Sequence, residues 1–145
     1  MSKQVLDIQQ MQHLKELGVD TSKASMVLLY TDDEGEIIEW EDADEFPGKF
    51  VELYDAETGN YEHSYRKYCG VFTLQDILDL LPKVIFNDKY KGKLCIEYNE
   101  HNNEWIISYK ELSVIVFYAH DENIIDAAYK MLCWCAENGY VDTKK

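Results

Sequence analysis

The sequence predicts an α+β fold: one two-layer domain in which a mainly antiparallel sheet of about five strands carries three helices mostly on one face. Three segments have helical apolar spacing with recognisable start and stop residues. Short apolar or aromatic runs, separated by polar turns, lie between them and indicate strands. The chain has 145 residues, two prolines and no linker-like tract. We therefore expect residues 1–145 to form a single domain.

The first helix is expected from about Asp7 to Leu17. The Asp7 carboxylate can accept hydrogen bonds from the free N–H groups at the helix start. Gly18 can adopt the left-handed conformation that ends a helix. One apolar stripe faces the core and comprises Ile8, Met11, Leu14 and Leu17.

Residues 25–31 and 36–41 read as two strands of a β-hairpin, because Gly35 allows a tight turn between them. The following stretch, 42–48, is acidic and contains Pro47, which favours a loop or a poor edge strand.

Residues 50–54 and 61–65 are expected to be extended around a longer loop. An alternative remains open for this region. Three tyrosines spaced four and three apart could instead form the stripe of a helix, namely Tyr61, Tyr65 and Tyr68.

The second helix begins after Thr73, which can cap it, and Asp76 stands where a capping box places Glu or Gln. Phe72 can pack against Ile77 across this start, and Pro82 ends the helix.

Three further strands are expected at 94–98, 105–109 and 114–118. Short polar connections separate them, so they should pair antiparallel as a meander. Residues 84–86 can add a short strand.

The last helix is expected over 121–138, with Asp121 as its cap and Gly139 as its stop. Asp126 and Lys130 lie four residues apart, an arrangement that favours an ion pair along the helix.

This helix is apolar around most of its circumference, so it must be covered on more than one side. We expect the sheet and another helix to cover it. The alternative is a homodimer to which the helix lends an apolar flank that includes Met131 and Trp134.

Three strings are similar to a group of small uncharacterised proteins encoded in prophages and other mobile elements of gut anaerobic bacteria. They are HLKELGVDTSKA (13–24), FTLQDILDLLP (72–82) and DAAYKMLCWCAENGY (126–140). The resemblance implies a genomic setting in which small inhibitory or accessory proteins are common. It implies no known function and no catalytic residue.

The net charge is −14, and most of the excess is regional. Residues 32–62 contain thirteen acidic residues against one base, Lys49. Such a region repels nucleic-acid phosphates and anionic membranes, so we expect neither as a partner. Aromatic side chains among the acids suit a protein interface. The candidate interaction residues are Asp32, Asp33, Glu34, Glu39, Trp40, Glu41, Asp42, Asp44, Glu45 and Phe46.

These features favour a noncatalytic interaction or inhibitory protein that binds a basic macromolecular surface. A sharper form of the hypothesis is a mimic of nucleic-acid charge that blocks a DNA-handling enzyme. One alternative is an acidic surface that only keeps the protein soluble. Two others are a structural, self-assembling domain and an enzyme whose site is not visible in the sequence, for instance a His63–Cys69 dyad.

We expect no catalytic residue, cofactor or metal site. No glycine-rich phosphate loop or zinc-protease motif occurs, and neither acidic run fits a calcium-binding loop. Cys133 and Cys135 fall about 200° apart around a helix, so they cannot hold one metal together. The N-terminus lacks the apolar run of a signal peptide, which makes the cytoplasm the expected compartment and reduced cysteines the expected state.

Basic residues are few, but four lysines gather around residues 83–93. The flanking rings of Phe86 and Tyr90 could stack on a base. A solvated loop whose charges protect strand edges is the simpler interpretation. The lysines are Lys83, Lys89, Lys91 and Lys93.

Overall fold

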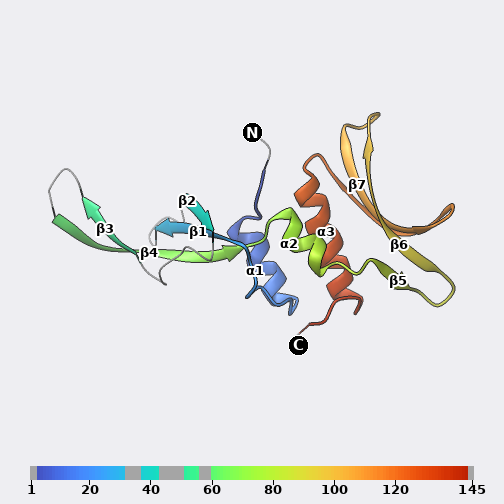
Figure 1. The fold of residues 1–145 in the computed structure, drawn as a ribbon, viewed down its shortest axis with the longest axis horizontal. Coiled ribbons are helices and arrows are strands. Elements are labelled where there is room, and N and C mark those ends of the chain that lie inside the picture. Colours follow the sequence, from blue (N-terminus) through green and yellow to red (C-terminus); the bar gives the residue numbers. More distant parts are fainter. Residues whose placement is uncertain (1–2, 32–36, 43–50, 56–59, 144–145) are drawn as a thin grey trace.

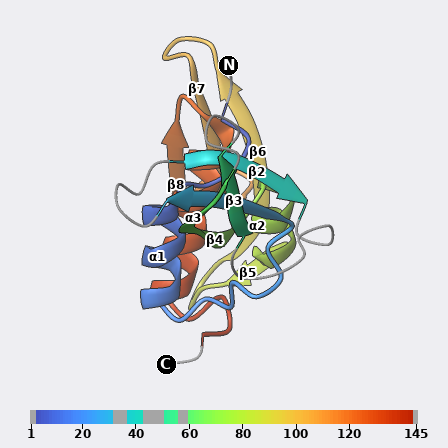
Figure 2. The same ribbon diagram turned by 90° about the vertical axis from the view of Figure 1, so that its left-hand side faces the viewer.

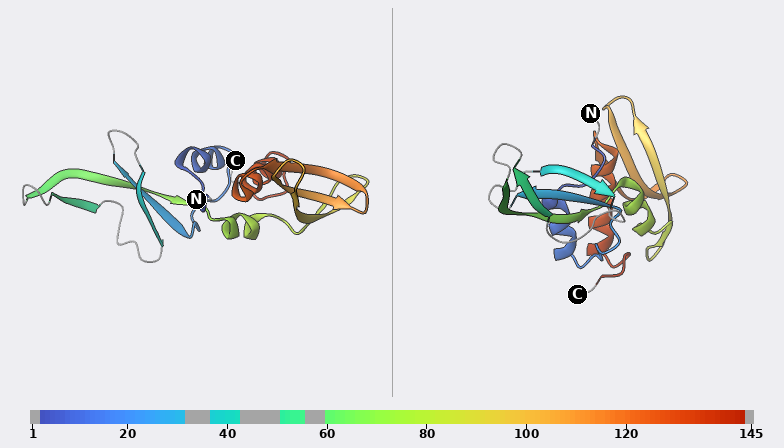
Figure 3. Two further views of the ribbon diagram at one scale, coloured as in Figure 1. Left: turned by 90° about the horizontal axis from the view of Figure 1, so that it is seen from above. Right: turned by 60° about the vertical axis from the view of Figure 1, so that its left-hand side comes forward.

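The computed structural model describes the backbone of residues 3–31, 37–42, 51–55 and 60–143, and the side chains of residues 3–26 and 70–143. The described chain contains three helices and two four-stranded antiparallel sheets (Figure 1). The predicted α+β class with three helices is confirmed. The helices lie between the two sheets along the long axis of the molecule (Figures 1 and 3).

Helix α1 (Ile8–Glu16) starts as the sequence predicts. The Gln10 backbone N–H donates to the Asp7 carboxylate at 2.8 Å, and the Asp7 N–H donates to the Gln10 side chain at 3.0 Å. These reciprocal bonds satisfy two N–H groups that a helix start leaves free. Gly18 follows the helix with φ of 89°, the left-handed conformation expected of its stop.

The N-terminal sheet contains β1 (Met26–Thr31), β2 (Ile37–Asp42), β3 (Val51–Asp55) and β4 (Asn60–Val71). Its strand order is β2-β1-β4-β3, and all its pairs are antiparallel. The β1–β2 hairpin is confirmed. The tyrosine-rich segment is extended within β4, so the alternative of a helix there is wrong. Residues 43–48 of the expected loop lie outside the described residues.

Helix α2 (Leu74–Leu80) carries the predicted capping box. The Asp76 N–H donates to the Thr73 hydroxyl at 3.2 Å, and the Thr73 N–H donates to the Asp76 carboxylate at 2.9 Å. Phe72 and Ile77, expected to pack across this start, are both buried.

The C-terminal sheet contains β5 (Val84–Phe86), β6 (Lys91–Asn99), β7 (Glu104–Glu111) and β8 (Val114–Asp121). These strands pair in sequence order and antiparallel, which confirms the predicted meander (Figure 2). Helix α3 packs on one face of this sheet, against β7 and β8.

The strands thus form two sheets of four, where the sequence predicted one sheet of about five. The length of β4 explains the difference. One part of this 12-residue strand pairs with β3 and the other with β1, so the first four strands complete their pairing with one another. The helix α2 then separates them from β5.

Helix α3 (Ile124–Glu137) has Asn123 as its N-cap residue, so the prediction of Asp121 as its cap is wrong. Asp121 ends β8, and its carboxylate accepts the Asn123 N–H at 3.0 Å. Gly139 has φ of 78° after the helix, as its role as a stop requires.

The two charged residues of α3 that were expected to pair bind elsewhere instead. Asp126 accepts hydrogen bonds from Lys3 and Gln10, each at 2.9 Å. Lys130 forms an ion pair with Asp121 at 3.0 Å. Because both partners lie outside α3, tertiary structure overrides the local four-residue spacing.

The hydrophobic core surrounds α3 on several sides. Seven of its residues are buried, and it packs against α2 as well as against β7 and β8. The expectation that more than one side of this helix is covered is confirmed. The core also includes Leu6, Phe72, Ile107 and Tyr109.

Candidate functional site

The predicted interaction residues fall into two groups. Those outside the described residues are Asp32, Asp33, Glu34, Asp44, Glu45 and Phe46. Those in the second half of β2, whose backbone is described, are Glu39, Trp40, Glu41 and Asp42. These four pair in register with residues 26–29 of β1, so this part of the predicted surface belongs to one edge strand.

Acidic residues lie on both outer strands of the N-terminal sheet, since β3 adds Glu52 and Asp55. The inner strand β1 carries no charged residue. The other inner strand, β4, brings in Arg66 and Lys67, which the sequence window 32–62 had left out. The described strands of this sheet contain six acids against two bases. The described part of the acidic excess therefore lies in one sheet.

An acid-lined hollow of about 320 Å³ lies where α1, α2 and the C-terminal tail meet. Three carboxylates from distant parts of the sequence line it. The Asp79 carboxylate accepts from Gln75 at 2.8 Å, and the Asp20 carboxylate accepts the Ser22 N–H at 3.0 Å. The lining comprises Val19, Asp20, Asp79, Leu80, Pro82, Tyr140, Val141 and Asp142.

This hollow combines negative charge with apolar walls. Such a lining suits the side chain of lysine or arginine, whose alkyl stem packs on apolar surface while its charged end meets carboxylates. Sequence reasoning missed it because Asp20, Asp79 and Asp142 share no periodicity and become neighbours only through packing of the three segments.

A second hollow, of about 250 Å³, lies near the tip of the β6–β7 hairpin. Here the His120 imidazole pairs through Nδ1 with the Glu104 carboxylate. Tyr118 lies beside His120 with ring centroids 5.9 Å apart. More than half of the His120 side chain is exposed, so water competes for the groups in this hollow. No serine, threonine or cysteine lines it, so the pair has no nucleophile of these types beside it to activate.

Buried thiols and phenols lie in the core. Burial raises the pKa of Cys133 and of Cys135 to about 11, so both thiols stay protonated at neutral pH. Burial also raises the pKa of Tyr109, whose hydroxyl donates to the Pro82 carbonyl at 2.7 Å. These groups behave as core residues. The side chains of a His63–Cys69 dyad lie outside the described ones.

The apolar flank of α3 is covered within the chain. Met131 is fully buried. The Trp134 ring stacks on Phe117, with centroids 4.4 Å apart, and on Tyr140, with centroids 5.2 Å apart. The two residues named in the homodimer hypothesis, Met131 and Trp134, are thus packed within the chain, with Trp134 still partly exposed.

Among the residues that the structure describes, no three His, Cys, Asp or Glu side chains are placed to hold a metal ion together. None of the described helices combines the length and hydrophobicity that crossing a bilayer needs. Comparison with protein-family models, with curated proteins and with solved structures finds no match.

Proposed function

We propose that this chain is a noncatalytic interaction or inhibitory protein that binds a basic surface on another macromolecule in the cytoplasm. The resemblance to proteins of mobile elements is compatible with this role. In its sharpest form, the acidic region mimics the charge of nucleic acid and blocks a DNA-handling enzyme.

The concentration of acidic residues on both outer strands of one sheet carries the proposal. Carboxylates along a strand edge attract cationic side chains and raise the rate of encounter with a basic protein. The acid-lined hollow at Asp20, Asp79 and Asp142 supports the proposal independently, because its charge and shape suit a lysine or arginine side chain.

A competing interpretation is that these charges only protect strand edges from pairing with other chains. The two interpretations differ in one respect. Protective charges need no partner, whereas an interface retains a specific basic protein whose binding weakens as salt screens the charges.

The test is a comparative pull-down from bacterial lysate at low and moderate salt. The baits are the native chain, the β2 variant Glu39→Gln/Glu41→Gln/Asp42→Asn, and a control that removes three exposed charges elsewhere, Glu100→Gln/Glu122→Gln/Glu137→Gln. We expect the native and control chains to retain the same basic protein and the β2 variant to lose it. Equal retention by all three baits would rule out β2 as the interface.

A further inference from the structure

Two turns of the C-terminal sheet expose large apolar side chains. The turn between β5 and β6 is closed by backbone hydrogen bonds between Asn87 and Tyr90, at 2.8 and 3.1 Å. Beside it, Phe86 is 72% exposed and Tyr90 is 44% exposed. In the turn between β7 and β8, Leu112 is 95% exposed. The Leu112 side chain therefore buries almost no surface in the core.

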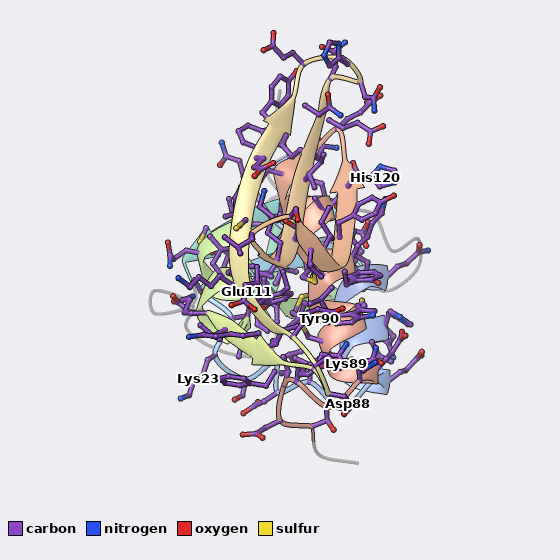
Figure 4. The ribbon with its side chains drawn as sticks, turned by 90° about the vertical axis from the view of Figure 1, so that its right-hand side faces the viewer. Lys23, Asp88, Lys89, Tyr90, Glu111 and His120 are labelled. Atoms are coloured by element: carbon purple, nitrogen blue, oxygen red, sulfur yellow. The ribbon has the colours of Figure 1, made fainter. Side chains whose placement is uncertain are left out.

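Both turns project from the same end of the molecule. They form the end of the long axis opposite β3 (Figure 1), and Figure 4 looks directly onto this end. The Lys91 N–H donates to the Glu111 carboxylate at 3.3 Å, which connects the base of one turn to the base of the other. One large surface placed against this end can therefore meet both turns at once.

Leu112 has an unusual backbone for its residue type. Its φ is 55°, in the left-handed region that favours glycine and asparagine. In the preceding turn, Asn103 has the same φ of 55°. Asparagine is a residue type that adopts this conformation readily. A leucine at such a position, exposed to water, has no explanation in the folding of the turn.

Three exposed lysines lie in or beside the turn between β5 and β6. Lys89 and Lys91 adjoin Tyr90 in the chain, and Lys93 lies two residues further along β6. Lys83 is exposed as well, but it donates to the Leu78 carbonyl at 2.6 Å and belongs to the end of α2. The nearby acids are Asp88 and Glu111, and the Glu111 carboxylate already accepts the Lys91 N–H (Figure 4).

We propose that this end of the chain docks on an anionic lipid membrane, with Leu112, Phe86 and Tyr90 entering the headgroup region and the lysines meeting lipid phosphates. Apolar side chains flanked by lysines are the chemistry of reversible membrane-surface binding. The two hollows described above lie elsewhere, and projecting tips suit a soft surface better than a flat protein or a nucleic-acid strand. This surface goes beyond the proposed function and uses different residues.

The expectation that membranes are excluded rested on residues 32–62. The helices separate the described strands of that region from the two turns (Figures 1 and 3). One helix is about 10 Å thick, and charges are screened over roughly 8 Å at physiological ionic strength. Repulsion from the acidic sheet is therefore weak at this end.

The test is flotation with vesicles of phosphatidylcholine alone and of phosphatidylcholine containing 30% phosphatidylglycerol. We expect the native chain to bind only the anionic vesicles. Leu112→Asn and Lys89→Glu/Lys91→Glu should each weaken binding about tenfold or more. Lys23→Glu is the matched control, since it reverses an exposed charge away from the two turns and should change binding less than twofold.

Absence of binding to anionic vesicles, or equal binding by all variants, would overturn the proposal. Thermal unfolding of each variant separates a lost surface from a lost fold. The β2 variant should bind vesicles normally, so the two proposals fail or succeed independently.

Discussion

At the scale of single residues, Asp126 connects three parts of the chain. It lies on α3 and accepts hydrogen bonds from Lys3, Gln10 and Asn123. Partial burial acts to raise its pKa, but the hydrogen bonds and the Lys3 charge outweigh burial, so its pKa lies below the usual value. The sequence showed a charged helical residue, but its partners lie 123 and 116 positions away and could not be predicted.

Asp126→Asn should lower the free energy of unfolding by about 1–2 kcal/mol at neutral pH, because hydrogen bonds to a charged group are lost. The lowered pKa means that the carboxylate stabilises the fold above the unfolded-state pKa of about 4 and loses that effect as the pH falls through the folded-state pKa. The difference between native and variant chains should therefore shrink in acid. Urea unfolding at several pH values measures it.

Lys130→Ala is the control for this prediction, since its partner Asp121 belongs to a more exposed ion pair. This substitution should lower the free energy of unfolding by less than about 1 kcal/mol. Equal effects of the two substitutions would contradict the role given to Asp126.

A substitution at Leu112 is expected to stabilise the fold, in contrast to the substitution at Asp126. Leu112→Asn should raise the free energy of unfolding by about 0.5–1 kcal/mol, because asparagine tolerates the left-handed conformation better. Asn103→Leu is the matched control at the same φ and should lower it. Thermal unfolding compares them, and a destabilised Leu112→Asn chain would show that the leucine serves the fold.

At the scale of elements, helix starts and turns were predictable where the signal is local. Asp7 and Thr73 cap their helices as their positions indicated. The prediction of the α3 cap was wrong because Asp121 is the last residue of β8, where its carboxylate accepts a hydrogen bond from the Asn123 N–H. The division into two sheets was not predictable, because it depends on β4 pairing with both β3 and β1. Local sequence patterns indicate strands, but they do not determine which strands pair.

The cover of α3 gives a prediction at this scale. Trp134→Ala removes the ring that stacks on Phe117 and Tyr140. It should lower the free energy of unfolding by about 2–4 kcal/mol. Because Trp134 packs within the chain, the molar mass of the variant, measured by light scattering, should equal that of the native chain. A dimeric native chain that this substitution converts to a monomer would support the alternative of a homodimer through α3.

At the scale of the whole molecule, the sequence predicted the acidic region but not its setting. Charge counting located the excess in residues 32–62, and the structure assigns the described part of it to the N-terminal sheet with acids on both outer strands. The acid-lined hollow and the exposed turns of the C-terminal sheet were not predictable as surfaces, because packing brings their residues together. The N-terminal sheet and the two exposed turns of the C-terminal sheet lie at opposite ends of the molecule (Figure 1).

The most direct test of the acidic interface is the affinity between this chain and the basic protein that the pull-down recovers, measured by titration at 50 and 200 mM NaCl. Attraction between opposite charges predicts that the native affinity falls about tenfold or more over this range. The β2 variant should bind weakly at both salt concentrations. An affinity that salt leaves unchanged, or that the β2 substitutions leave unchanged, would contradict the account.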